Sequence, residues 1–178
     1  MYKEAIDFWF TEIESKQWWQ KDIGFDSMAQ SRFGSLHEQA KAGELFEWRH
    51  TALGSLAEVI ILDQFSRNIY RKKLESFACD SLALALAQVA ISKDFDAELP
   101  KTERSFLYLP FMHSESKLLH TEAIKLFESL GNSNNLEFEH KHKAIIDKFG
   151  RYPHRNGILG RESTAEEIEF LKQPNSNF

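Results

Sequence analysis

The residues of this 178-residue chain that are best suited to chemistry lie in one short segment, residues 149–161, which reads Phe-Gly-Arg-Tyr-Pro-His-Arg-Asn-Gly-Ile-Leu-Gly-Arg. The segment carries Arg151, His154, Arg155 and Arg161 in an otherwise acidic protein. Its glycines and its proline predict a shaped loop rather than a helix or a strand. Because an arginine fork fits a carboxylate or a phosphate, the loop predicts an anion site without naming the anion.

A second polar cluster follows an almost wholly apolar helix predicted within residues 48–68. Asp63 and Arg67 are four residues apart with the acid first, so they can pair on one helix face. Asn68 and Arg71 share the adjacent face. Polar side chains at the end of a buried helix need partners. The cluster is therefore either an internal network that fixes helix packing or a ligand site at the mouth of a helical bundle.

A third group of polar residues lies near Pro110, which is predicted to end or kink the helix before it. His113 and Glu115 follow at this junction, where they suit a general base and its orienting carboxylate. On the helix predicted over residues 136–149, His142 lies on the apolar face. It is either a hydrogen-bonded core histidine or a ligand-binding residue.

The first functional hypothesis unites these clusters in one small-molecule site. The candidate acid, base or orienting groups are His113, Glu115, His154 and Asp63. The candidate ligand-binding residues are Arg67, Asn68, Arg71, His142, Arg151, Arg155 and Arg161. The chain has no nucleophile elbow and no Walker or Rossmann glycine pattern, so it predicts no reaction type and no cofactor, and it leaves enzymatic activity open. A weaker alternative is a zinc or other transition-metal site made by His113, Glu115, His142 and His154.

The elements that must position these residues are predicted to be helices. Apolar residues recur three and four apart near residues 2–10, 26–42, 48–68, 75–93, 101–109, 115–130, 136–149 and 164–172. Strand signals are weak, so an all-α fold is expected. Ser163 and Glu166 have the spacing of a capping box that would start the last helix. We expect a single domain over residues 1–178 with a frayed tail at 173–178.

The composition excludes some classes of protein. The net charge of −5 argues against nucleic-acid binding, which requires a basic face. The apolar runs are too short to span a bilayer, so no membrane association is expected. Cys79 stands alone among apolar neighbours, which predicts a buried thiol and fits the reducing cytoplasm. His37, His50 and His120 show no partner pattern and are predicted to be surface residues.

The aromatic residues are concentrated in the first 48 positions. They predict a bulky N-terminal subcore, because aromatic side chains dominate core burial. The alternative is an aromatic wall for a ligand or peptide. Trp18 and Trp19 cannot both face inward on a helix, so one of them is available to line a groove.

Several ordered motifs resemble the signature blocks of the bacterial domain-of-unknown-function family 924. They are Phe8-Trp9-Phe10, Trp18-Trp19, residues 62–71, residues 109–115, His142, residues 149–156 and residues 159–161. Ser66 and Met112 stand where the family pattern has Pro and Glu. The resemblance covers nearly the whole chain and implies a tetratricopeptide-like fold, a right-handed superhelix of helices. It implies no activity, cofactor or catalytic residues.

This resemblance supports a second functional hypothesis, a helical binding module for a peptide or protein partner. Concave grooves of tetratricopeptide-like helices hold peptides, and arginines there can clamp an acidic C-terminus. In that case the polar clusters are mainly structural. A small anionic ligand and a peptide partner are therefore both open at this point.

Overall fold

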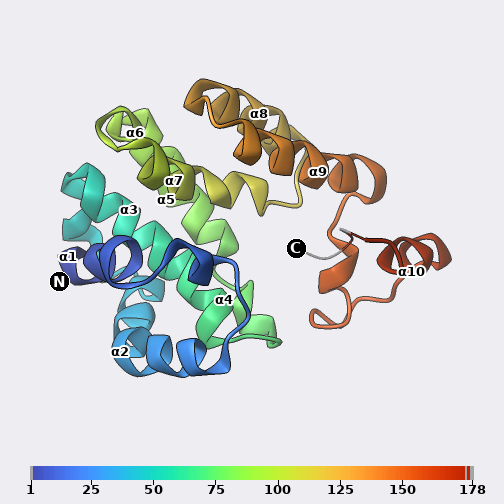
Figure 1. The fold of residues 1–178 in the computed structure, drawn as a ribbon, viewed down its shortest axis with the longest axis horizontal. Helices are drawn as coiled ribbons and strands as arrows, with labels where there is room; N and C mark the ends of the chain where they lie inside the picture. The colour runs from blue at the N-terminus through green and yellow to red at the C-terminus, as the bar shows by residue number, and fades with distance from the viewer. Residues whose placement is uncertain (1, 175, 177–178) are drawn as a thin grey trace. The chain divides into compact units, whose positions relative to one another are not determined.

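Every described element of the computed structural model is helical, and Figure 1 shows this for residues 2–174 and 176, the part of the chain that the structure describes. The elements are α1 (Tyr2–Asp7), η1 (Phe8–Glu12), η2 (Ser15–Trp18), α2 (Ile23–Lys41), η3 (Phe46–His50), α3 (Ala52–Ile60), η4 (Ile61–Phe65), α4 (Ser66–Ile69), η5 (Leu74–Ser76), α5 (Asp80–Ser92), α6 (Phe95–Glu98), α7 (Lys101–Met112), α8 (Lys117–Leu130), α9 (Ser133–Phe149), η6 (Pro153–Arg155) and α10 (Ala165–Leu171). Segments η1 and η4 are π-helical and the other η segments are 3-10 turns. The predicted all-α class is confirmed, and the described residues contain no strand.

Contacts along the chain divide it into two compact units. Unit 1 comprises Met1–Arg71 and Glu75–Pro110, and unit 2 comprises Lys72–Leu74 and Phe111–Phe178. The single domain expected over residues 1–178 stays a prediction. The expected frayed tail lies partly outside the described residues.

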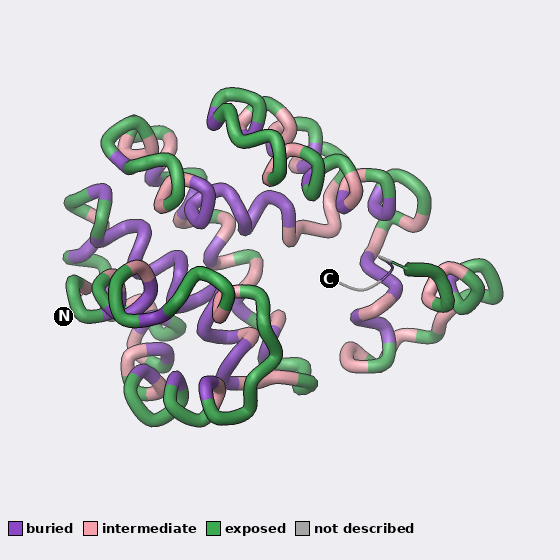
Figure 2. Tube along the Cα trace, in the orientation of Figure 1, coloured by how far each residue is buried: buried purple, intermediate pink, exposed green. Residues whose placement is uncertain are grey.

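The centre of unit 1 is the apolar helix α3 with the π-helical segment η4 that continues it. Leu56, Val59 and Leu62 are 0% exposed, and such buried stretches are purple in Figure 2. Helix α3 packs against α1 and α5. Gly54 permits a close backbone approach, because a Cβ at this position would lie 2.2 Å from the carbonyl oxygen of Trp48. Any side chain at this position would therefore force the backbone to shift.

A charged pair is buried with this apolar helix. Glu58 is 0% exposed, and the Arg49 guanidinium holds both of its oxygens, with Nε 2.7 Å from Oε2 and Nη2 2.6 Å from Oε1. A forked contact of this kind satisfies both carboxylate oxygens at once. The buried carboxylate on α3 therefore depends on Arg49 for its counter-charge and hydrogen bonds. Arg49 belongs to the preceding turn η3.

The predicted N-terminal aromatic subcore is confirmed in unit 1. Phe8, Trp9, Phe33 and Phe65 are at most 1% exposed. Four of their ring pairs have centroids between 4.8 and 5.9 Å apart, in tilted or edge-to-face geometry. Aromatic rings prefer these arrangements, so the rings fix η1, α2 and η4 relative to one another.

The prediction that Trp18 and Trp19 do not both face inward is confirmed. Trp18 donates its Nε1–H to the carbonyl oxygen of Trp9 at 2.8 Å. Trp19 is 63% exposed and stacks on Phe106 at an interplanar angle of 11°. One tryptophan is thus bound into unit 1 and the other is presented to solvent.

One stretch of the described chain, Leu74–Ser92, has the length and apolar composition of a membrane span. Its regular helix α5 has only 13 residues, which is about 20 Å long against a hydrocarbon core of about 30 Å. Ala83, Ala87 and Ala90 are buried, and α5 packs against α3. We interpret α5 as a packing helix of unit 1.

In unit 2, α8 and α9 lie side by side as a helical hairpin (Figure 1). The predicted break at Gly131 is confirmed, since this residue has the positive φ of 67° that ends α8. Asn132 then caps α9 by accepting hydrogen bonds from the N–H groups of Asn134 and Asn135, at 3.1 and 3.3 Å. The turn therefore follows directly from the Gly-Asn sequence.

Two predicted helix boundaries are wrong by a short distance. Helix α7 does not end at Pro110 but continues to Met112, and the alternative, a kink at Pro110, stays a prediction. A proline in the last turn removes one backbone donor and leaves the preceding turns intact. The capping box of α10 is formed by Thr164 and Glu167 rather than by Ser163 and Glu166.

Candidate functional site

The polar cluster of unit 1 binds the protein's own carboxylates. Arg67 lies 3.1 Å from Asp63 Oδ1, so the predicted pair on one helix face is confirmed. The same guanidinium forms a fork with Asp80, with both contacts at 3.1 Å. Gln64 donates to the other Asp63 oxygen at 2.5 Å. Arg67 therefore joins the end of η4 to the first turn of α5.

Asn68 and Arg71 both reach Asp26 in the first turn of α2. The Asn68 amide donates to Asp26 Oδ1 at 3.1 Å. Arg71 donates to the two Asp26 oxygens at 2.5 and 2.7 Å. These contacts hold α4 to α2 within unit 1. A ligand-binding role for Arg67, Asn68 and Arg71 stays a prediction. The contacts given above join these side chains to carboxylates of the chain itself.

The C-terminal loop is held to α10 by Arg151. Its guanidinium forms a fork with Glu167 at 2.7 and 2.8 Å and also donates to the carbonyl oxygen of Glu162 at 2.9 Å. Asn156 and the backbone N–H of Thr164 donate to the same carboxylate. The hydrogen bond from Arg151 is the main cause that lowers the pKa of Glu167 to about 2, against the opposing effect of burial. Glu167 is therefore the anion that this part of the loop binds.

Glu167→Gln is expected to destabilise the protein near neutral pH and much less in acid. The folded pKa of Glu167 is about 2 and its ordinary value is 4.5, so the carboxylate contributes its full stability above the ordinary value and loses it as the pH falls toward 2. Urea unfolding curves of the wild type and the variant should converge over this window. Glu166→Gln is the matched control, because the Glu166 side chain is 67% exposed beside Lys148. A constant difference between wild type and Glu167→Gln across the window would contradict the prediction.

Arg161 closes the loop onto Glu115. It forms a fork with the Glu115 carboxylate at 2.6 and 2.9 Å and donates to Asn156 Oδ1 at 3.0 Å. The backbone N–H of Tyr152 donates to the same carboxylate at 2.8 Å. Burial alone would raise the pKa of Glu115, but these hydrogen bonds outweigh it and lower the pKa. Glu115 is thus an ionised anchor for the loop.

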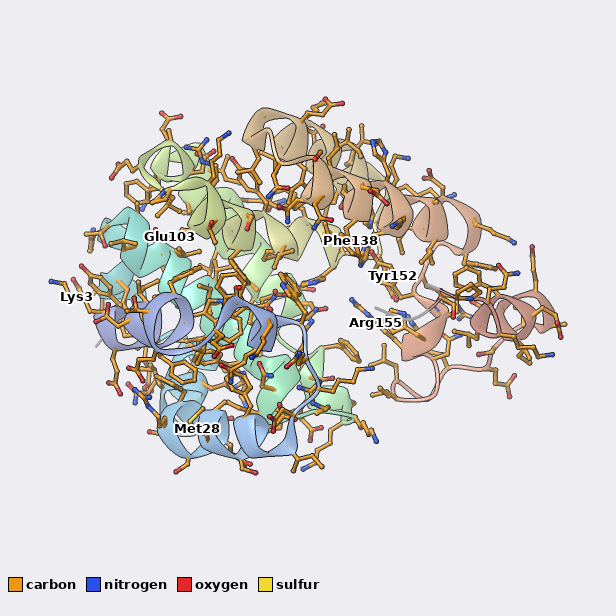
Figure 3. All side chains as sticks on the ribbon, in the orientation of Figure 1. Lys3, Met28, Glu103, Phe138, Tyr152 and Arg155 are labelled. Atoms are coloured by element: carbon orange, nitrogen blue, oxygen red, sulfur yellow. The ribbon has the colours of Figure 1, made fainter. Side chains whose placement is uncertain are left out.

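A ring of nitrogen-bearing side chains surrounds Tyr152 in unit 2. The Tyr152 side chain is 0% exposed, and the Arg155 guanidinium lies 4.6 Å from its ring centroid; both are labelled in Figure 3. The rings of His142 and His154 have centroids 5.7 and 5.5 Å from that of Tyr152. His113 is close enough for its charge to act on His142. We call this group of Tyr152, His113, His142, His154 and Arg155 the Tyr152 cluster.

His142 is held in its neutral form inside this cluster. It is 6% exposed, and its Nδ1 lies 2.8 Å from the carbonyl oxygen of Phe138, so Nδ1 carries the proton. Burial is the main cause that lowers its pKa to about 3. The charges of His113, His120 and His154 act in the same direction, while the bond to Phe138 opposes them. The predicted inward orientation of His142 is confirmed.

A buried pair between α8 and α9 was missed by the sequence reasoning. His120 and Glu139 are both 0% exposed, with Nδ1 2.6 Å from Oε1. His120 Nε2 lies 2.9 Å from the carbonyl oxygen of Ser114 and 3.2 Å from the Tyr152 hydroxyl. Burial raises the pKa of Glu139, and His120 partly offsets this. The pair joins the hairpin to the phenol of Tyr152.

The predicted surface position is wrong for His120 and for His37. His37 is 1% exposed, and its Nε2 lies 2.7 Å from the Ser66 hydroxyl, which itself donates to the carbonyl oxygen of Leu62. The predicted buried position of Cys79 beside this group is confirmed, because Cys79 is 3% exposed. Helical spacing could have predicted the burial of His37, because His37 follows Phe33 by four residues and both are buried on α2. The prediction for His50 is confirmed, since its side chain is 73% exposed.

The structure thus divides the candidate residues between the two units. Asp63, Arg67, Asn68 and Arg71 belong to unit 1, whereas His113, Glu115, His142, Arg151, His154, Arg155 and Arg161 belong to unit 2. Among the described residues, no three histidine, cysteine, aspartate or glutamate side chains form a group that could hold a metal ion. The metal alternative from His113, Glu115, His142 and His154 is therefore not supported.

Comparison with other proteins gives the family of the chain. Residues 5–175 match the model of a family described as bacterial protein of unknown function (DUF924). A solved structure of a protein of unknown function from Agrobacterium tumefaciens is similar at 37% sequence identity and a TM-score of 0.91, covering 96% of each chain. No curated protein matches. The chain belongs to the DUF924 family, and its fold is similar to that of the Agrobacterium protein over 96% of the chain.

Proposed function

We propose that the Tyr152 cluster of unit 2 binds a small molecule carrying a phosphate or a carboxylate. The observation that supports this is the gathering of two imidazoles and one guanidinium around a single buried phenol, with His113 near enough to act on His142. Imidazole and guanidinium N–H groups are the donors that recognise oxyanions. The proposal keeps His113 and His154 as candidate acid or base groups and leaves the reaction open.

The charges of unit 2 favour this ligand class. Three acids beside the cluster are already engaged: Glu115 by Arg161, Glu139 by His120 and Glu167 by Arg151. Arg155 is only 6% exposed and lowers the pKa of Glu115 through its charge. The guanidinium and the neighbouring imidazoles offer N–H donors, which favour an anionic ligand over a cationic one.

Binding of an oxyanion should be coupled to protonation of His142. The imidazole is neutral near neutral pH because its pKa is lowered to about 3. A bound anion favours the charged imidazolium and so raises this pKa. By linkage, the anion binds more tightly as the pH falls.

Calorimetric titration with inorganic phosphate and with acetate tests the proposal. We expect binding to the wild type that is stronger at about pH 6 than at about pH 8, measured at constant ionic strength. Arg155→Met should weaken binding about tenfold or more. Arg32→Met is the matched control, because Arg32 forms an exposed pair with Glu12 in unit 1.

His154→Gln serves as a second variant if Arg155→Met does not fold. Weaker binding by His154→Gln with an unchanged melting temperature supports the site. Absence of binding by both anions at both pH values overturns the proposal. Equal affinity in wild type and Arg155→Met overturns it as well.

A peptide-binding role is the second candidate, supported by the exposed apolar surface at the start of unit 1. Trp19 and Ile23 are 63% and 83% exposed. Exposed aromatic side chains are frequent at sites that hold a protein or peptide. Trp19→Ala should abolish capture of a peptide partner while the phosphate titration stays unchanged, and this separates the two candidates. We propose a tetratricopeptide-like superhelix only together with this peptide-binding role.

A further inference from the structure

A groove of about 490 Å³ opens on unit 1. Its wall is formed by α1 and η1, by the first turn of α3, and by the end of α6, the start of α7 and the segment that links them. This volume suits a small organic molecule, since ligand pockets commonly range from about 300 to 1,000 Å³. The groove lies within unit 1 and is distinct from the Tyr152 cluster, so it is independent of the function proposed above.

The charged lining of this groove is acidic. Asp7, Glu98 and Glu103 contribute carboxylates, and no lysine, arginine or histidine lines it. Within residues 2–174 and 176, none of these three acids takes part in an ion pair or a side-chain hydrogen bond. Glu103 is half-buried, and burial raises its pKa. A half-buried carboxylate of this kind is stabilised by a cation that enters the groove.

The apolar lining supplies two aromatic rings and a hydrocarbon floor. Tyr2 and Phe10 bring the rings, and Ile6 and Leu99 bring aliphatic surface. The face of an aromatic ring attracts an ammonium group within about 6 Å. Carboxylates and rings in one groove therefore complement a molecule that has a positive charge on an apolar body.

We propose that this groove binds an organic ammonium ion, with the charged group against Glu103 and its neighbouring acids and the apolar body against Tyr2 and Phe10. The three negative charges oppose any anionic occupant. They also distinguish an amine from a neutral molecule of the same shape, because only the amine balances the charge.

Titration with three probes of similar shape tests this proposal: phenethylammonium, 2-phenylethanol and phenylacetate. The full chain should bind phenethylammonium at least about tenfold more tightly than the alcohol, and phenylacetate should bind more weakly than either. Equal affinity for the amine and the alcohol would overturn the proposal. So would preferential binding of phenylacetate.

Glu103→Gln should reduce the preference for the amine over the alcohol about tenfold. Glu103 also lies in the first turn of α7, where a carboxylate complements the helix dipole, so the variant is expected to be less stable as well. The amine-to-alcohol ratio measured on folded protein separates these effects. Glu128→Gln, an exposed position on α8, is the control and should leave the ratio unchanged.

Leu53→Trp is a second variant that fills the groove while keeping all its charges. It should weaken binding of the amine and the alcohol together. An unchanged amine affinity in both Leu53→Trp and Glu103→Gln would place the ligand elsewhere and overturn the assignment.

Discussion

Replacing Arg49 with methionine is expected to lower the free energy of unfolding by about 3–5 kcal/mol. Glu58 is 0% exposed on α3, and both of its oxygens are held by Arg49. Methionine keeps much of the packing of the arginine stem but leaves the carboxylate buried without its counter-charge. Urea unfolding followed by circular dichroism measures the loss.

Two further variants identify the cause. Arg32→Met removes a pair of similar geometry, with Nη1 2.6 Å from Glu12 Oε2, but Glu12 is 48% exposed, so little stability should be lost. The double variant Arg49→Met/Glu58→Met removes both buried charges and should recover most of the loss. If the double variant were as unstable as Arg49→Met, lost packing rather than the stranded carboxylate would be the cause.

Acidification is expected to destabilise the wild type through His142. Its folded pKa is about 3 and its ordinary value is 6.5, so between these values the unfolded chain binds a proton that the folded chain does not. Stability is therefore lost as the pH falls below 6.5, with a slope that approaches about 1.4 kcal/mol per pH unit. His142→Gln should show a shallower decline over the same range. Unfolding curves at several pH values in a chloride medium without phosphate measure this.

His50→Gln is the control for the histidine prediction, because the His50 side chain is 73% exposed. Its stability should follow the wild type at every pH. Parallel curves for the wild type and His142→Gln would show that the protein admits the charged imidazolium at little cost. The groups that face His142 and oppose its charge, His113, His120 and His154, are present in all three proteins.

Sequence patterns predicted the structural features that depend on residues close together in the chain. The Asp63–Arg67 pair, the break at Gly131 and the inward face of His142 depend on helix periodicity or turn chemistry, and all three are found. The α10 cap was misplaced because Ser163 and Thr164 each precede a glutamate by three residues. Spacing alone cannot choose between two overlapping capping boxes.

The carboxylate partners of the arginines could be identified only from the tertiary structure. Arg71 binds Asp26 across 45 positions, and Arg161 binds Glu115 across 46. No helical period links such residues, so the sequence suggested an anion but not whether the protein supplied it. For Arg67, Arg71, Arg151 and Arg161 the structure supplies carboxylates from the chain itself.

The position of Cys79 has a practical consequence for labelling this protein. The thiol is 3% exposed, and burial raises its pKa, so only a small fraction is present as the reactive thiolate. A cysteine introduced at an exposed position such as Glu128 should therefore react first with a maleimide dye. The native cysteine can remain in place, which preserves its packing beside Ser66 while a fluorophore reports on ligand binding.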